Sequence, residues 1–250
     1  MAVSRKGKAL HGAAGVKGYF ATTRSPMVAA VVTLPLLLLY NVGLLMPGSS
    51  MLNAADLLTN LVVEQAGLIG FLVINGFLVL VSVILMVVLA RQGRLRPAHW
   101  LALCAEGLVL GLLLGHTVLY VMGQAQLLAV DGGQDLPIAQ ALSLAAGAGY
   151  WEEIVFRLAM VGGPIALARR RWAGKGFGDV GRVVLVGVMA VVLSSMLFSL
   201  AHHLGSESID PFTFWYRALS GLVFSGIFLV RGFAVAAYTH FLYDVVVLVF

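Results

Sequence analysis

Three short segments of the chain combine carboxylates, histidines and an arginine at helical spacing. Residues four apart share a helix face, so each segment presents its functional groups together. If the three faces converge, they supply one carboxylate to activate water, two imidazoles and a further polar group that orients a histidine or holds a carbonyl oxygen. Such a set can hydrolyse a peptide bond. The residues of the three segments are Glu152, Glu153 and Arg157, then Phe198 and His202, then His240 and Asp244.

Within the first segment, the arginine is expected to neutralise one carboxylate better than the other. Glu153 lies four residues before Arg157 and shares its face of an α-helix, so the two can form an ion pair. Glu152 lies five residues before Arg157, about 140° around the helix. A carboxylate in a medium of low dielectric constant binds a proton more tightly than one in water, and a general base near neutral pH needs that affinity. We therefore predict that Glu152 is the base and that Glu153 and Arg157 support it.

The composition places these residues in a membrane protein. Of 250 residues, 60% are hydrophobic and 11% are charged, whereas an ordinary soluble domain carries about 25% charged residues. A soluble globular enzyme is therefore excluded. One cysteine, Cys104, cannot build a disulfide framework or a cysteine zinc site. The net charge of +5 does not indicate nucleic-acid binding, because the basic residues cluster between long apolar runs.

Seven apolar segments approach the length that crosses about 30 Å of hydrocarbon. They are residues 27–46, 66–90, 101–123, 137–168, 183–204, 214–230 and 233–250. The sequence thus predicts an all-α polytopic membrane protein of about seven transmembrane helices that enclose an intramembrane active-site chamber. We divide it into a basic segment, residues 1–26, and one integral membrane domain, residues 27–250, whose core 137–250 carries the motifs.

Every second loop between the predicted spans is rich in lysine and arginine. Short cytoplasmic loops collect these residues, so we expect the N-terminus in the cytoplasm and the C-terminus outside. The apolar composition and short loops are typical of a bacterial inner-membrane protein. Two further polar residues lie inside a span: Glu106, which we expect either to extend toward the membrane surface or to pair with a basic loop residue, and His116, which either bonds a neighbouring helix or faces the chamber.

The motifs EExxxR, FxxxH and HxxxD, in this order on three membrane helices, resemble those of the CAAX protease and bacteriocin-processing (CPBP, or ABI) family of intramembrane proteases. The resemblance covers residues 137–250. It implies that Glu152 activates water and that His202, His240 and Asp244 complete the catalytic site, the last two at the oxyanion. It also implies that Phe198 and Phe156 line the chamber. Asparagine is common in the family where this chain has Asp244.

The resemblance implies a protein or peptide substrate that is membrane-anchored, as with prenylated CAAX tails, bacteriocin leaders or C-terminal sorting signals. His202 lies near the outer end of its predicted span, which suits a site that opens outward and trims exported proteins, as in myxosortase-like members. The bilayer is the other expected partner. No nucleic acid is expected.

Three alternatives remain at the level of sequence. Glu152, His202 and His240 form a reasonable zinc set; the zincin motif HExxH is absent, and the resemblance favours a site that requires no cofactor. Carboxylates and histidines within spans also relay protons in transporters, although the sequence has no inverted repeat. Finally, Glu152, Glu153 and Arg157 could form a structural ion network that only joins helices.

Overall fold

The computed structural model describes residues 16–46, 54–123, 137–172, 176–203 and 210–249. Within these ranges the secondary structure is helical and no strand occurs, which confirms the predicted all-α class. The basic segment 1–26 is therefore described only from residue 16, and the loop residues Asp131, Asp135 and Glu207 lie outside the described residues. In chain order the helices are α1 (Val16–Thr23), α2 (Pro26–Val32), α3 (Leu34–Leu44), α4 (Ala54–Arg91), α5 (Pro97–Val121), α6 (Ile138–Gly147), η2 (Ala148–Gly162), α7 (Gly163–Trp172), α8 (Phe177–His202), α9 (Pro211–Arg231) and α10 (Phe233–Val249).

Each of the seven predicted spans is helical, and the chain is an integral membrane protein. In the described part, five helical stretches are long and apolar enough to cross a membrane, namely Pro26–Leu44, Ile69–Arg91, Pro97–Val121, Gly178–His202 and Pro211–Arg231. The last predicted span is the 17-residue helix α10, which is shorter. The predicted span 137–168 consists of three consecutive helical segments, α6, η2 and α7.

Two predicted loops are wrong in part because helix continues into them. Residues 54–65, placed in a loop by the sequence, are the first part of α4, which bends at Gly67. Gly67 has φ 67° and ψ 174°, a conformation that L-amino acids with a side chain rarely adopt. The predicted start of the span at residue 66 therefore marks a kink and not a helix end. The predicted basic loop 169–182 is likewise shortened, since α7 ends at Trp172 and α8 begins at Phe177.

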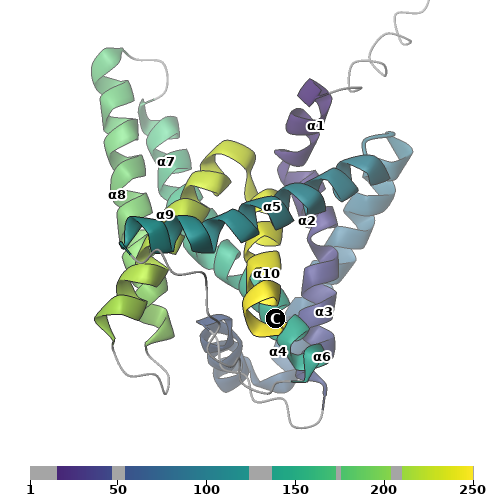
Figure 1. Ribbon diagram of the computed structural model, residues 1–250. Coiled ribbons are helices and arrows are strands. Elements are labelled where there is room, and N and C mark those ends of the chain that lie inside the picture. Colours follow the sequence, from purple (N-terminus) through teal and green to yellow (C-terminus); the bar gives the residue numbers. More distant parts are fainter. Residues whose placement is uncertain (1–15, 47–53, 124–136, 173–175, 204–209, 250) are drawn as a thin grey trace, which may run out of the picture.

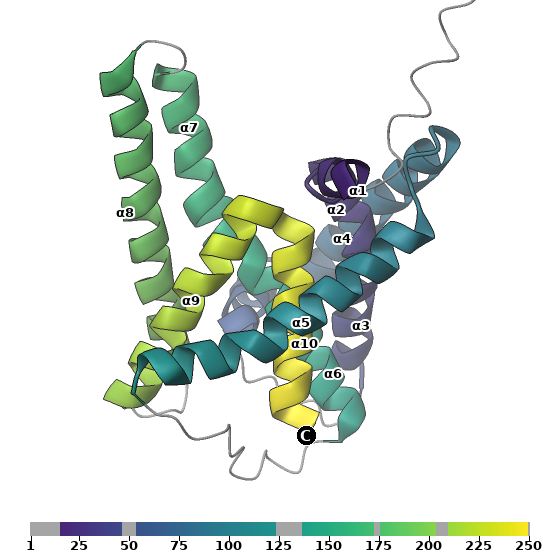
Figure 2. The same ribbon diagram turned by 45° about the horizontal axis from the view of Figure 1, so that its top comes forward.

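Helix α10 lies at the centre of the fold, packed against α5, α6, η2 and α9 (Figure 1). In Figures 1 and 2, α5 crosses α10 obliquely, while α7 and α8 stand side by side away from α2 and α3. The outer helices α4 and α8 present large apolar side chains such as Ile69 and Met189, which are 79% and 62% exposed. In a bilayer these side chains face lipid.

Glycines allow the central helices to approach closely. A Cβ atom on Gly107 or Gly111 of α5 would lie 3.1 Å from the backbone of α10, and one on Gly149 of η2 would lie 2.6 Å from the Ala237 carbonyl oxygen. In lipid the hydrophobic effect does not drive helices together, so the close van der Waals packing that small residues allow stabilises such contacts. The packing of α10 therefore depends on positions that cannot hold a larger side chain.

One partly buried polar cluster joins three helices, α1, α5 and α9. The guanidinium of Arg231, at the turn between α9 and α10, donates to both carboxylate oxygens of Glu106, at 2.5 and 2.8 Å. The Tyr19 hydroxyl of α1 also donates to Glu106. Burial, helped by the adjacent Glu106, raises the pKa of Tyr19 well above its ordinary value, so the hydroxyl keeps its proton. Of the two alternatives expected for Glu106, pairing with a basic residue is the one confirmed.

A substitution at Gly149 should destabilise the protein, whereas the same substitution at Gly163 should not. Gly149→Ala forces η2 away from α10, and overpacking of this kind costs about 1–3 kcal/mol. Gly163 has helical φ of −58° and no atom within 4 Å of its Cβ position, so Gly163→Ala should raise stability slightly. Thermal unfolding of the purified variants in one detergent measures both. Equal midpoints for the two variants would show that the α10 contact does not limit packing.

Candidate active site

The three motif segments lie on η2, α8 and α10, and these helices pack against one another. Glu152, Glu153, Phe156 and Arg157 all lie on η2, a π-helix in which backbone bonds join residues five apart. Residues five apart therefore come nearer to one face than in an α-helix, so the predicted 140° separation of Glu152 from Arg157 is wrong for this segment. π-helical turns inside longer helices occur frequently at functional sites.

Glu153 is the centre of a fully buried ionic network. Its Oε1 atom lies 3.1 Å from Nη1 of Arg157 and 2.8 Å from Nδ1 of His240. Glu153 and Arg157 are both 0% exposed. A buried charge of this kind is tolerated only when it is paired. The predicted ion pair within the helix is therefore present, and it also reaches α10.

Aromatic rings lie close to the guanidinium group of Arg157. The guanidinium carbon of Arg157 lies 4.3 Å from the ring centre of Phe198 and 5.0 Å from that of Phe224. Within the described part of the chain, Nε and Nη2 of Arg157 have no hydrogen-bond acceptor. Cation–π attraction to desolvated rings is worth about 2 kcal/mol. These rings thus help to hold a charge that the hydrogen bonds alone would not satisfy.

Phe224 was not predicted from the sequence. Its ring stacks on His240 with centres 4.3 Å apart and planes inclined by 27°. Phe224 lies on α9, in a span that is apolar around it, so no polar spacing marks it. Only the packing of α9 beside α10 shows that this phenylalanine fixes the plane of a site histidine.

Glu152 faces the two histidines of the other segments. Its Oε2 atom lies 3.8 Å from Nε2 of His202 and 3.9 Å from Nε2 of His240, and the residue is 1% exposed. The two imidazoles come from α8 and α10, which are far apart in sequence. The three segments therefore meet at Glu152, as the sequence predicted.

The second ring nitrogen of each histidine is already bound. Nδ1 of His202 lies 2.8 Å from the carbonyl oxygen of Phe198, which can only accept, so Nδ1 carries the proton. Nδ1 of His240 lies 2.8 Å from the carboxylate of Glu153 and donates to it. Both rings are thus held in one orientation, with Nε2 directed to the shared space beside Glu152.

Asp244 lies one turn beyond His240 on α10, and its Oδ2 atom is 3.6 Å from Nε2 of that histidine. The carboxylate therefore flanks the same nitrogen that faces Glu152. Phe198 and Phe156, predicted to line a chamber, are buried and pack edge to face at 5.3 Å. Phe198 also contacts His202, with ring centres 4.9 Å apart. Their role as chamber walls stays a prediction.

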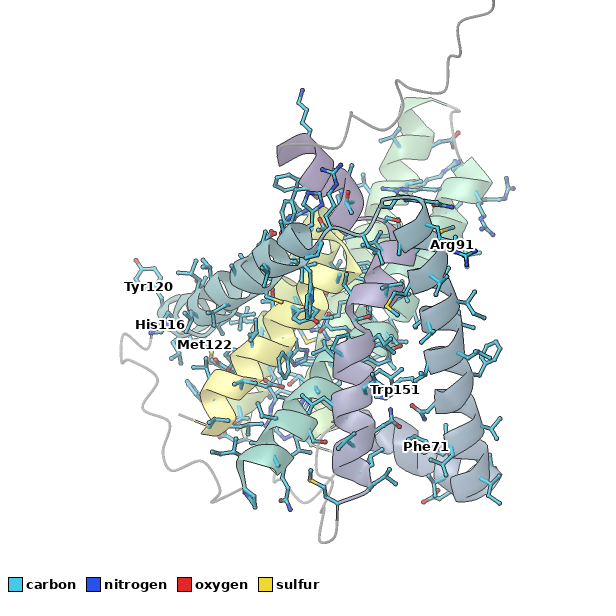
Figure 3. All side chains as sticks on the ribbon, turned by 90° about the vertical axis from the view of Figure 1, so that its right-hand side faces the viewer. Phe71, Arg91, His116, Tyr120, Met122 and Trp151 are labelled. Atoms are coloured by element: carbon cyan, nitrogen blue, oxygen red, sulfur yellow. The ribbon has the colours of Figure 1, made fainter. Side chains whose placement is uncertain are left out.

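Two other histidines lie apart from this site. His203 stacks on Phe214 with ring centres 6.1 Å apart. His116 is exposed, and Nδ1 lies 2.8 Å from the carbonyl oxygen of Leu112. Figure 3 shows His116 with Tyr120 and Met122 near the C-terminal end of α5, away from Trp151 of η2. His116 therefore does not face the site.

Glu152, His202 and His240 are the residues that would bind zinc in the metal-dependent alternative. Among the residues that the structure describes, no group of three or more His, Cys, Asp or Glu side chains has an arrangement that could hold a metal ion. The Nε2 atoms of the two histidines still approach the same Glu152 oxygen with their Nδ1 atoms bound, which is how ligating histidines are commonly held.

Residues 134–246 match the family model described as Type II CAAX prenyl endopeptidase Rce1-like. No curated protein and no solved structure matches the chain. The matched segment begins just before α6 and contains all three motifs, and the matched family is a family of proteases.

Breaking the buried ion pair should be far more damaging than breaking an exposed one. Arg157→Met leaves the carboxylate of Glu153 buried without its cation and should lower the free energy of unfolding by about 3–5 kcal/mol. Arg182→Met removes a similar 3.1 Å pair with Asp179, but Arg182 is 63% exposed, so its loss should stay within about 1 kcal/mol.

Adding Glu153→Gln to Arg157→Met should recover part of the loss. Unfolding in detergent, measured for both single variants and the double variant, gives the coupling energy. Strict additivity of the two changes would contradict the network described here.

Proposed function

We propose that the protein is an intramembrane endopeptidase in which Glu152 activates water, because residues 134–246 match the family model of Rce1-like type II CAAX prenyl endopeptidases. The peptide bond that it hydrolyses lies near the membrane-anchored or C-terminal end of a protein substrate. The observation that carries this proposal is the approach of two Nε2 atoms, from separate helices, to one oxygen of Glu152.

In this mechanism Glu152 is the general base. A water molecule beside Oε2 donates one proton to the carboxylate and the other to Nε2 of His202, which is an acceptor because Nδ1 carries the ring proton. The lone pair of the water oxygen is then directed at the substrate carbonyl carbon. As the bond to carbon forms, the proton passes to Glu152, which later delivers it to the leaving amine.

His240 stabilises the oxyanion in the same scheme. Its Nδ1–H is already donated to Glu153, so donation from Nε2 to the oxyanion requires the imidazolium form. Glu153 and Asp244 flank the two ring nitrogens and balance that positive charge. In this scheme Asp244 balances the charge of His240 and does not contact the oxyanion, because an ionised carboxylate repels a developing negative charge. Arg157 and Glu153 act as positioning residues.

A zinc-dependent version is the second candidate. Here Glu152, His202 and His240 would be ligands, and the metal would polarise the carbonyl and lower the pKa of a bound water. The bound Nδ1 atoms of both histidines would suit it, since ligating histidines are oriented in this way, but the described residues do not form a group that could hold a metal ion, which favours the metal-free version. The family match favours either protease over a proton-coupled transporter.

The position of His202 supports a site that opens outward. His202 is the last residue of α8, at the end opposite Phe177, whereas the arginines of α7 and Arg231 lie near the other end of the fold (Figure 1). With the basic end in the cytoplasm, His202 lies toward the outside of a bacterial inner membrane. Such a site would process exported proteins that keep a membrane anchor, as expected of a myxosortase-like enzyme.

Glu152→Gln should abolish cleavage while leaving the fold intact. The amide keeps the shape of the side chain but cannot take a proton, and loss of a general base lowers the rate by about 10²–10⁴-fold. Purified protein is assayed on membrane-anchored reporters with prenylated or C-terminal anchors, in excess chelator. Asp179→Asn, a carboxylate-to-amide change at the start of α8, is the control and should retain full activity. If the wild type loses cleavage in chelator and recovers it when zinc is added, the metal-free mechanism is wrong and the zinc-dependent version takes its place.

The orientation is tested with single cysteines in a Cys104→Ala background. A membrane-impermeant maleimide added from outside should label His202→Cys, at the end of α8, and should not label Arg94→Cys, at the basic end of the fold. The two sites serve as controls for each other, because inverted vesicles should reverse the pattern. Labelling of position 202 from the cytoplasmic side alone would overturn the outward opening.

A further inference from the structure

A cavity lies away from the candidate catalytic residues, between α1, α2, the end of α4 and the start of α5. Its volume is about 390 Å³, within the range of small-ligand pockets. The walls are mainly apolar, including Val28, Val31, Met86 and Leu103. The catalytic residues Glu152, His202 and His240 do not line it.

Basic side chains line the same cavity in the segment between α4 and α5. Arg94 is exposed and Arg96 is half-buried, and both belong to the lining. Nη2 of Arg94 lies 3.4 Å from the Ser25 hydroxyl, between α1 and α2. This segment follows the end of α4, where Figure 3 places Arg91, at the basic end of the fold. The cavity therefore combines an apolar interior with two guanidinium groups at the level of the membrane surface.

A buried polar atom is also present in the lining. His99, on the first turn of α5, packs edge to face on Tyr19 with ring centres 5.7 Å apart. Its Nδ1 atom is buried and has no hydrogen-bond partner among the described residues. A buried ring nitrogen ordinarily has such a partner. An acceptor or donor on a bound molecule would supply it.

The apolar walls and the paired arginines point to one class of occupant. A cavity lined mainly by aliphatic side chains suits a hydrocarbon chain. Arginine binds phosphate oxygens with paired N–H donors, and each basic residue near an anionic membrane surface adds attraction. We propose that this cavity binds one acyl chain of an anionic phospholipid, with Arg94 and Arg96 on its phosphate. The site is distinct from the catalytic site and does not rest on the proposed function.

Native mass spectrometry of the full chain in detergent tests this site. The probes are phosphatidylglycerol and phosphatidylcholine with identical acyl chains, and glycerol 3-phosphate as a headgroup without chains. We expect a retained adduct with phosphatidylglycerol, a weaker one with phosphatidylcholine and none with glycerol 3-phosphate. Retention of glycerol 3-phosphate as strong as that of the lipid would overturn the acyl-chain part, because the site would then be one for free phosphate esters.

Two variants separate the headgroup from the chain. Arg94→Gln/Arg96→Gln should weaken phosphatidylglycerol binding by about 10- to 30-fold, to the level of phosphatidylcholine. Thr22→Phe, which places a ring in the cavity from α1, should weaken both lipids alike. The matched control Arg169→Gln/Arg170→Gln removes two exposed arginines from the last turn of α7 and should bind as the wild type does.

The result that overturns the proposal is equal binding by the Arg94→Gln/Arg96→Gln variant and its control, or wild-type binding by Thr22→Phe. Thermal unfolding in the same detergent identifies a variant that has lost its fold. If the Arg94→Gln/Arg96→Gln variant has lost its fold, headgroup binding is measured with Arg94→Gln alone, because Arg94 is exposed and lies outside any helix.

Discussion

The buried carboxylate of Glu153 is the group on which the arrangement of the candidate site depends. It binds Arg157 of its own helix and His240 of α10, so one charge links η2 to the central helix and orients a site imidazole. Removing a guanidinium and a carboxylate from water is expensive, and their attraction offsets this cost only when the geometry is close and the surroundings fixed. Phe198 and Phe224 supply those surroundings by covering the arginine and contacting His240.

The same network explains how two adjacent glutamates can have different roles. Glu153 is held by the arginine and by Nδ1 of His240, whereas Glu152 faces Nε2 of both histidines. Neighbouring residues on a helix point in different directions, so the two carboxylates meet different partners, as the proposed roles of support for Glu153 and of general base for Glu152 require. The π-helical turn keeps both carboxylates and Arg157 within reach of α8 and α10.

Close contact between helices gives the network its rigidity. Gly149 lets η2 lie against the backbone of α10 at Ala237, and Gly107 lets α5 pack on the backbone of the same helix at Tyr238. At the basic end, Glu106 and Arg231 join α5 to the turn that begins α10. Helix α10 is therefore fixed on several sides. A site that stabilises a transition state by electrostatics requires donors that do not reorganise, and a helix held in this way meets that requirement.

The sequence alone determined that the protein lies in a membrane, that its fold is all-α and which residues form the motifs, because composition and helical spacing act locally and survive without tertiary information. It also predicted that Glu153 pairs with Arg157, four residues away. The tertiary structure decided what spacing within one helix cannot: that both histidines turn Nε2 toward Glu152, that His240 donates to Glu153, and that Phe224 stacks on His240. It also revealed the π-helical geometry of η2 and the continuation of helix beyond Gly67. These features arise from contacts between helices distant in the chain, where packing, and not local periodicity, sets the geometry.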